Sequence, residues 1–154
     1  LPEAEIIPVS ATERFNVDYL FKRIRELLPE SPPFFEKDAL TDRPARFFVT
    51  EIIREKILTL YDKEIPYAVE VVVETFKEEP GIVRIGVLIY VERDSQKGIL
   101  IGKGGKMLKK VGTEARKDIE AFLDKKICLN LFVKVEKDWR NKEGKLRLFG
   151  YQPN

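Results

Sequence analysis

The sequence predicts an α+β domain in which helices pack on a small sheet, and three observations support this. Apolar and polar residues alternate over 67–75, 83–93 and 127–135, the pattern of half-buried strands. Apolar residues recur every three or four positions over 48–60 and 108–122, the pattern of helices that cover one face of a sheet. A glycine-rich segment between the second and third predicted strands completes the domain and separates two helices.

Residues 1–30 are predicted to form a strand and a helix of a different fold. Ile6, Ile7 and Val9 make a short apolar run, and Asn16 is placed to cap the helix that follows. The apolar positions of that helix are Val17, Leu20, Phe21, Ile24, Leu27 and Leu28. One short strand cannot cover such a stripe, so we expect these residues to be the end of a larger domain.

Prolines mark a predicted domain boundary. Pro29, Pro32 and Pro33 interrupt the helical pattern, because proline lacks an N–H and fixes φ. We therefore expect a linker at 31–40 and a second domain over 41–154.

The second domain is expected to begin with a helix that starts at Thr41-Asp42-Arg43-Pro44 and reaches about Tyr61. The first two strands should form a hairpin with its turn at residues 77–81. A further helix should begin near Lys106. Gly112 inside it indicates close packing, since glycine costs a helix about 1 kcal/mol relative to alanine.

The remaining residues exclude several classes of site. A basic tail over 137–151 is expected to form a short last helix, with Trp139 as a packing anchor rather than a base-stacking platform. Cys128 is expected to be a small buried residue on a strand. A lone cysteine and the absence of histidine exclude an internal disulfide, a zinc site and a histidine-based triad. No apolar run has the length of a membrane span.

The glycine-rich segment has the composition of a phosphate-binding loop. Two familiar motifs fail on spacing: a P-loop that begins at Gly98 would need glycine at Lys103, and a dinucleotide fingerprint from Gly102 would need glycine at Met107. The remaining match is Gly-x-x-Gly over 102–105, the loop with which KH domains clamp about four nucleotides. Alone this pattern is weak, and a plain glycine turn is the alternative.

The charge distribution favours the phosphate interpretation. From Lys97 to Lys117 there are seven basic residues and one acidic residue, a net charge of +6 within a chain whose total is +2. The rest of the chain therefore carries −4. A solvated helix face usually mixes both signs, whereas a nucleic-acid site gathers positive charge.

The order helix, strand, strand, glycine loop between helices, strand resembles the type II KH fold, which implies a three-stranded mixed sheet. The chain further resembles the Era family, bacterial RNA-binding GTPases of small-subunit ribosome assembly. The matching segments are Thr41-Asp42-Arg43, Glu51-Ile52-Ile53-Arg54-Glu55-Lys56, Ile65-Pro66-Tyr67, Val91-Glu92-Arg93, Ile101-Gly102-Lys103-Gly104-Gly105-Lys106, Gly112-Thr113-Glu114-Ala115-Arg116-Lys117-Asp118 and Val133-Lys134-Val135 with Trp139.

The resemblance implies the function, the site and the partners. The target would be the single-stranded region near the 3′ end of the small-subunit ribosomal RNA, within the small ribosomal subunit. The residues expected to bind RNA are Gly102, Lys103, Gly104, Gly105, Lys106, Lys109 and Lys110. We expect a monomer in the bacterial cytoplasm, with peripheral association at the inner membrane left open for the intact protein.

The resemblance also implies that residues 1–30 are the last strand and helix of a GTPase domain. Ser10 and Ala11 would then be a remnant of its nucleotide pocket. The P-loop, the switch regions and the guanine-specificity motif are missing from the sequence. We therefore expect no catalysis and no cofactor in this chain, although GTP and Mg²⁺ are implied for the intact protein. Two other functions remain open: a phosphate-handling enzyme and a KH-containing structural protein of the ribosome.

Overall fold

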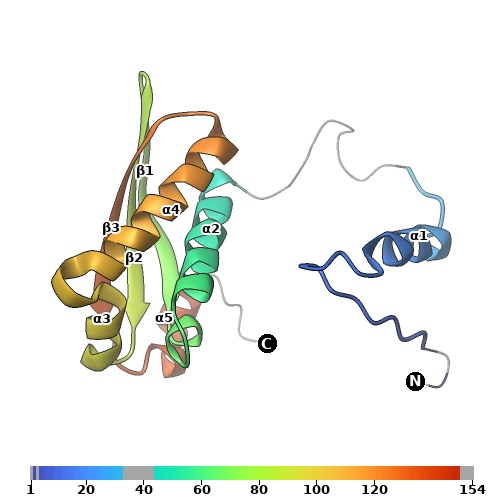
Figure 1. The fold of residues 1–154 in the computed structure, drawn as a ribbon, viewed down its shortest axis with the longest axis horizontal. Coiled ribbons are helices and arrows are strands. Elements are labelled where there is room, and N and C mark those ends of the chain that lie inside the picture. The colour runs from blue at the N-terminus through green and yellow to red at the C-terminus, as the bar shows by residue number, and fades with distance from the viewer. Residues whose placement is uncertain (1, 3, 33–43, 150–154) are drawn as a thin grey trace. The chain divides into compact units, whose positions relative to one another are not determined.

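The structure, a computed structural model, describes residues 2, 4–32 and 44–149. The chain divides into two compact units, Leu1–Thr41 and Asp42–Asn154 (Figure 1). Most of the linker predicted at 31–40 lies outside the described residues, as does the predicted helix start at Thr41-Asp42-Arg43. No helix in the described part of the chain is long and apolar enough to cross a membrane.

The described residues of the first unit form one helix, α1 (Val17–Leu27), none of whose residues is buried. The strand predicted around Ile6 to Val9 is absent there, and the same residues hold only an isolated bridge between Ser10 and Phe15. A strand needs a neighbour to take its hydrogen bonds, and the described part of this unit offers none. Asn16 is the N-cap residue of α1 as predicted, but its side chain donates to the Pro8 carbonyl (3.1 Å) and makes no capping hydrogen bond.

The second unit is built on a three-stranded sheet of β1 (Glu70–Glu79), β2 (Ile82–Val91) and β3 (Ile127–Val135). Its order is β1-β2-β3, with β1 and β2 antiparallel and β2 and β3 parallel, so the sheet is mixed as predicted. The hairpin is longer than expected. Its turn is only Pro80 and Gly81, because Lys77 to Glu79 still pair with β2. A bulge between Val73 and Thr75 shifts the register of β1.

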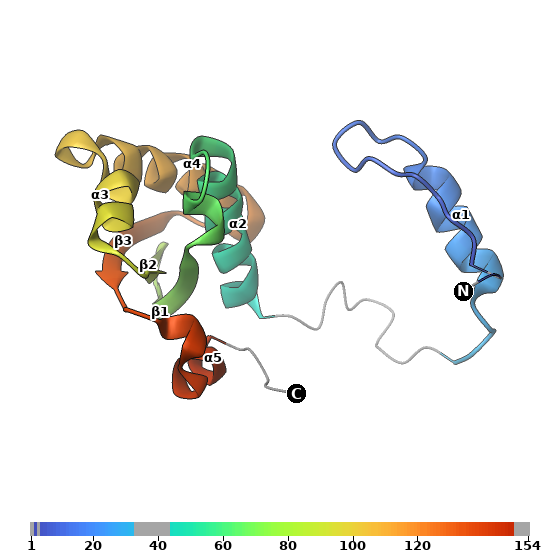
Figure 2. The same ribbon diagram turned by 90° about the horizontal axis from the view of Figure 1, so that it is seen from below.

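Three helices lie on one face of the sheet: α2 (Ala45–Leu60), α3 (Asp94–Ile101) and α4 (Lys106–Leu123) (Figures 1 and 2). Short 3₁₀ turns follow α2 (Ile65–Tyr67), join α3 to α4 (Lys103–Gly105) and follow β3 (Trp139–Asn141). The core lies between the helices and the sheet. Its fully buried large side chains are Val49, Ile53, Ile57, Val83, Ile85, Val87, Ile89, Val91, Leu100, Val111 and Ile119. This arrangement confirms the predicted α+β fold.

The last helix, α5 (Glu143–Leu148), confirms the helix predicted in the basic tail. Trp139 is only 3% exposed and packs edge-on against Phe149 at 5.2 Å between ring centroids, so it is the anchor that the sequence predicted. Phe149 also contacts the Tyr90 ring at 5.0 Å. The alternation along 83–93 predicts Tyr90 on the polar side of β2, with Arg84 and Gly86, but Tyr90 is buried because this C-terminal segment covers it.

Candidate nucleic-acid interface

The loop between α3 and α4 is held open by its backbone conformation. Gly102, Gly104 and Gly105 have φ of 72°, 61° and 74°, values that residues with a Cβ rarely adopt. The Gly102 N–H donates to the Gly98 carbonyl (2.9 Å), and the Gly105 N–H donates to the Gly102 carbonyl (3.1 Å). The N–H groups of Lys103 and Gly104 lie between these two bonds, and neither donates to another group in the described chain. Two free donors in the turn that precedes α4 suit an anion.

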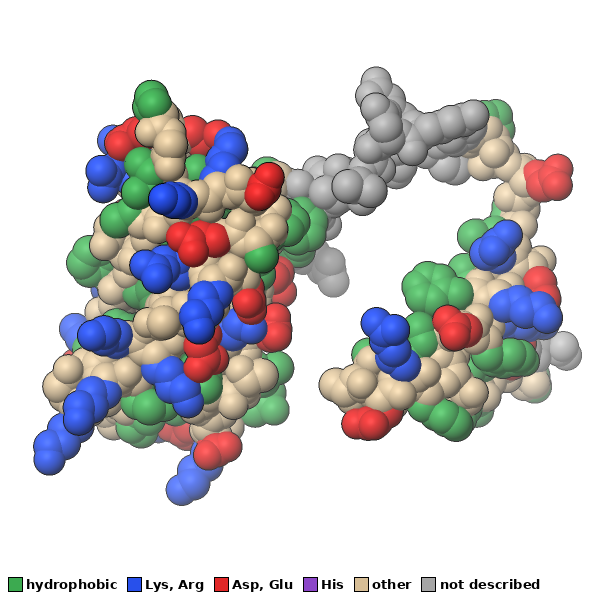
Figure 3. Space-filling model, turned by 45° about the horizontal axis from the view of Figure 1, so that its top comes forward, with side chains coloured by type: hydrophobic (Ala, Val, Ile, Leu, Met, Phe, Trp, Pro, Cys, Tyr) green, Lys and Arg blue, Asp and Glu red, His purple; other side chains and the backbone are tan. Residues whose placement is uncertain are grey.

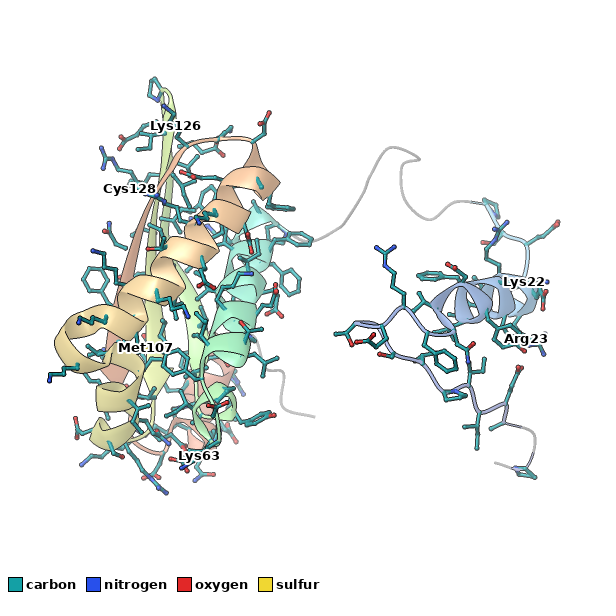
Figure 4. The ribbon with its side chains drawn as sticks, in the orientation of Figure 1. Lys22, Arg23, Lys63, Met107, Lys126 and Cys128 are labelled. Atoms are coloured by element: carbon teal, nitrogen blue, oxygen red, sulfur yellow. The ribbon has the colours of Figure 1, made fainter. Side chains whose placement is uncertain are left out.

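The glycines of the loop serve two different purposes. A Cβ on Gly102 would lie 2.7 Å from Cγ of Met107, so this glycine allows the chain to pack against the first turn of α4 (Figure 4). A Cβ on Gly104 or Gly105 would meet nothing within 4 Å. The outer side of the loop is therefore open, and a ligand could approach its main chain there.

The helix before the loop is fixed at both ends. At its beginning, Oε1 of the buried Gln96 accepts from the N–H groups of Glu92 and Arg93, both at 3.0 Å. At its end, the Tyr61 hydroxyl donates to the Leu100 carbonyl at 2.6 Å in a buried bond. Burial raises the pKa of Tyr61 to about 12. Tyr61 thus connects the end of α2 to the last turn before the Gly-x-x-Gly loop.

Basic side chains surround the loop without acidic partners. The seven basic residues from 97 to 117 make no ion pair within the described chain. They are Lys97, Lys103, Lys106, Lys109, Lys110, Arg116 and Lys117. In Figure 3 basic side chains project into solvent at the lower left of the second unit, where α4 begins.

Folding alone does not explain this arrangement. Lys106 and Lys110 are four residues apart on α4, and like charges at that spacing destabilise a helix by about 0.2–0.5 kcal/mol. The first turn of α4 contains no acidic residue, although the positive end of the helix dipole favours one. Positive charge is thus concentrated where the helix itself disfavours it, which indicates an anionic ligand.

A groove runs from the loop along α4 and is closed on its other side by β3. Its volume is about 570 Å³. The lining residues are Gly105, Leu108, Lys109, Gly112, Thr113, Arg116, Leu129 and Leu131. A Cβ on Gly112 would lie 3.3 Å from Cδ1 of Leu131, which confirms the close packing predicted there. The groove has a floor of leucines, a charged rim and the glycine loop at one end.

The sequence-predicted residues fall into two groups. Gly105 and Lys109 line the groove, whereas Lys103, Gly104, Lys106 and Lys110 are exposed on and beside the loop. Gly102 belongs to neither group, because it is half-buried against Met107. Thr113 and Arg116 were not predicted, but their spacing of four and seven residues from Lys109 could have indicated a shared face. The leucines of β3 could not be found this way, because their place depends on the packing of β3 beside α4.

Ser10 and Ala11 lie in the first unit, in a turn closed by its own hydrogen bonds. The Ser10 hydroxyl accepts from the Glu13 N–H at 3.2 Å. For the implied GTP and Mg²⁺, the sequence holds no Gly-Lys followed by Ser or Thr. The described residues contain no group of three His, Cys, Asp or Glu that could hold a metal ion. The donors present do not make up a nucleotide site.

Comparison with known proteins places this geometry in a family. A family model described as KH domain matches residues 64–140, which include both helices of the loop, the loop itself and all three strands. The chain belongs to the KH domain family. The predicted resemblance to a KH fold is therefore confirmed.

Curated relatives of this KH chain are the proteins named GTPase Era. The one from Geotalea daltonii is 52% identical over 152 residues, covering 98% of this chain and 51% of the relative. The one from Staphylococcus haemolyticus is 53% identical over 148 residues, covering 96% of this chain and 50% of the relative. The predicted resemblance to the Era family is confirmed by these matches. The chain spans about half the length of these relatives.

Two solved structures of Era also match. A variant of Aquifex aeolicus Era bound to GDP and AlF4⁻ has a TM-score of 0.89 and 40% identity, and the match covers 99% of this chain and 52% of that one. Era in complex with MgGDPNP and nucleotides 1506–1542 of 16S ribosomal RNA has a TM-score of 0.88 and 40% identity. That match covers 97% of this chain and 51% of the Era chain.

Proposed function

We propose that this chain binds single-stranded RNA through the 102–105 loop and the groove beside α4. We further propose that it does so as part of an Era-like GTPase acting in assembly of the small ribosomal subunit, on the 3′ region of its ribosomal RNA. The solved complex of Era with nucleotides 1506–1542 of 16S ribosomal RNA supports this target. The observation that carries the proposal is the open Gly-x-x-Gly loop amid seven basic residues that have no acidic partner.

Binding would divide between the loop and the groove. The free N–H groups of Lys103 and Gly104 would donate to a phosphate, and the ammonium groups of Lys106, Lys109 and Lys110 would neutralise its neighbours. These contacts position the strand without distinguishing its sequence.

Bases would enter the groove. Leu129 and Leu131 offer an apolar surface for base faces, and Gly112, which packs closely on Leu131, adds no side chain that would cover it. Thr113 and Arg116 would supply hydrogen bonds to base edges. A Gly-x-x-Gly loop clamps about four nucleotides, which sets the scale of the site.

The two other functions have less support. A phosphate-handling enzyme would need a group that attacks or protonates the phosphate, and the groove is lined by no carboxylate, thiol or histidine. A structural protein of the ribosome could use the same KH core. The similarity to GTPase Era extends over 98% of this chain, residues before the KH domain included, and favours the GTPase family.

The proposal also covers the role of the intact protein to which this chain would belong. The intact protein would hydrolyse GTP with Mg²⁺, and residues 1–30 would be the end of its GTPase domain, joined by a linker at 31–40 to the KH unit at 41–154. Ser10 and Ala11 would belong to the nucleotide pocket of that domain. We propose a cytoplasmic monomer in bacteria, with peripheral association of the intact protein at the inner membrane.

The test compares two double variants with the same chemical changes. Lys103→Asp/Gly104→Asp places two carboxylates in the loop. Lys63→Asp/Gly81→Asp makes the same changes elsewhere: Lys63 follows α2 (Figure 4) with φ of 58°, and Gly81 in the hairpin turn has φ of 81° and open space around it. Both variants should lose similar stability, because each adds one Asp at an open positive-φ glycine.

Only the loop variant should lose RNA affinity. We expect a loss of about a hundredfold or more for a short single-stranded RNA, measured by fluorescence anisotropy beside thermal melts, because two carboxylates would face the phosphates. Equal affinity of the loop variant and the wild type, with both proteins folded, would show that the loop is only a turn.

A further inference from the structure

The face of the sheet opposite the helices is open over most of its area. Register places side chains on this face in rows that cross all three strands. The rows are Lys77-Arg84-Cys128 near the hairpin turn, then Thr75-Gly86-Asn130, then Val72-Leu88-Phe132, and finally Glu70-Tyr90-Lys134. Among the residues that the structure describes, the last row is covered, since Phe149 after α5 packs on Tyr90. Figure 2 shows the three large helices on one side of the sheet and α5 at its other side.

One aromatic side chain stands out on the open face. Phe132 is 60% exposed on β3, although phenylalanine is among the residues most often buried. Beside it, Asn130 is exposed, and no other described residue hydrogen-bonds to its amide. Gly86 at the centre of the second row presents no side chain, and the Thr75 side chain lies where its Cβ would be. The face therefore combines an unstacked ring and an amide that has no hydrogen-bond partner in the described chain.

The charge of this face is positive. Lys77 and Lys134 are exposed and make no ion pair in the described chain, and Lys134 lies over the Tyr90 ring at 6.0 Å. Arg84 pairs with Glu79 at 2.8 Å, and both side chains are about half exposed. The acid at the covered end, Glu70, is buried and accepts from the side chain of Arg54 at 2.9 Å, so it presents no free charge to the surface.

The open face adjoins the groove through a single strand. β3 is the edge strand of the sheet, and its residues alternate between the two sides. Leu129 and Leu131 line the groove, whereas Asn130 and Phe132, their neighbours in sequence, lie on the open face. A strand of nucleic acid that leaves the groove across β3 would therefore meet Phe132 within one residue of Leu131.

We propose that the open sheet face binds the continuation of the same RNA strand, with a base stacked on Phe132 and phosphates held by Lys134 and Lys77. This inference rests on the proposed function and extends its site beyond the loop. An exposed aromatic ring flanked by basic residues is how proteins bind single strands without reading their sequence. The positive charge of the face favours a polyanion over an apolar protein partner.

The test uses two RNA lengths. One single strand of about four nucleotides has the length that a Gly-x-x-Gly loop clamps, and another of about twelve can also reach the sheet face. Phe132→Ala removes the ring, and Phe132→Leu keeps an apolar side chain of similar size without a surface for stacking. Tyr67→Ala is the control, because Tyr67 is an aromatic outside the sheet that is even more exposed than Phe132 (75% against 60%).

We expect both Phe132 variants to melt like the wild type and to bind the longer RNA about tenfold more weakly, the low end of the range for loss of one base stack. Their affinity for the shorter RNA should not change, and Tyr67→Ala should change neither. Lys134→Gln should flatten the salt dependence for the longer RNA only.

Three outcomes would overturn the inference. Unchanged affinity for the longer RNA would exclude a stack on Phe132. An equal loss for both lengths would place the effect in the groove. Sedimentation that shows a wild-type dimer and a Phe132→Ala monomer would make the face a contact between copies of the chain. In each case loss of binding in Lys103→Asp/Gly104→Asp would still support the proposed function, which fails only if that variant binds both RNAs like the wild type.

Discussion

Helices α2 and α4 pack against each other and over the same face of the sheet, yet their exposed charges differ. Each buries three residues spaced four apart, Val49, Ile53 and Ile57 on α2 and Val111, Ala115 and Ile119 on α4, all with no exposed surface. Their contributions to the core are thus nearly identical in pattern. The difference between the two helices lies in what their basic residues contact.

On α2 two of the three basic residues have acidic partners, and the third, Arg46, lies over the Phe76 ring at 5.8 Å. Arg54 pairs with Glu51 (3.2 Å) and with Glu70 (2.9 Å), and Lys56 pairs with Glu55 and with Asp118 of α4. The Asp118 carboxylate raises the pKa of Lys56. On α4 all the lysines and Arg116 lack such partners in the described chain. Paired charge on α2 belongs to the fold, whereas unpaired charge on α4 is available to a ligand.

Of the substitutions that test this difference between α2 and α4, Tyr61→Phe should have the largest effect on stability. Tyr61 is the residue through which α2 positions the loop. The substitution leaves the Leu100 carbonyl without its buried donor and should lower the free energy of unfolding by about 1–2 kcal/mol. Denaturant titration measures this loss. It should be accompanied by weaker RNA binding, since the last turn of α3 is less well fixed.

The pH dependence of that loss provides the control. The folded-state pKa of Tyr61 is raised to about 12 from an ordinary 10, so the neutral hydroxyl stabilises the fold fully below pH 10. This contribution is lost as pH rises from 10 to 12, when the folded protein ionises Tyr61. The difference between wild type and Tyr61→Phe should therefore shrink over that range. A constant difference would contradict the assignment of the buried bond.

Replacing either of two helical glycines by alanine should have a smaller effect on stability. Gly98→Ala, at an exposed site on α3 with nothing within 4 Å, should raise stability by about 1 kcal/mol and leave RNA affinity unchanged. Gly112→Ala should gain less, because its Cβ would press on Leu131 at 3.3 Å and displace that side chain into the groove. RNA affinity of Gly112→Ala should fall several-fold. Unchanged affinity would show that bases do not enter between α4 and β3.

The sequence predicted most of the second unit, because its elements carry local signals. Alternation located β2 and β3, helical spacing located α2 and α4, and the spacing of the glycines located the loop. The errors share one cause. The extent of the hairpin, the burial of Tyr90 and the missing strand near Ile6 all depend on which distant segment pairs with or covers them, and that information is not local.

The same limit applies to the candidate site. Lys103, Lys106, Lys109 and Lys110 could be selected because charge and glycine are visible along the chain. Arg116 could have been predicted from its spacing of seven residues from Lys109 on one face of α4. The place of Leu131 in the groove and the exposure of Phe132 depend on the position of β3 at the edge of the sheet. The seven basic residues were predicted as a group. That they lack acidic partners could be found only from the fold.

The central claim is that the unpaired lysines of α4 and its loop bind phosphates, and the salt dependence of RNA binding tests it most directly. Contacts with about four phosphates predict a slope near −3 for log affinity against log salt concentration, at about −0.7 per phosphate on a single strand. Lys109→Gln/Lys110→Gln should reduce that slope by about 1.4 if each lysine neutralises one phosphate. Lys63→Gln, outside the site, should leave it unchanged. A wild-type slope near zero, or the same slope in all three proteins, would contradict the claim.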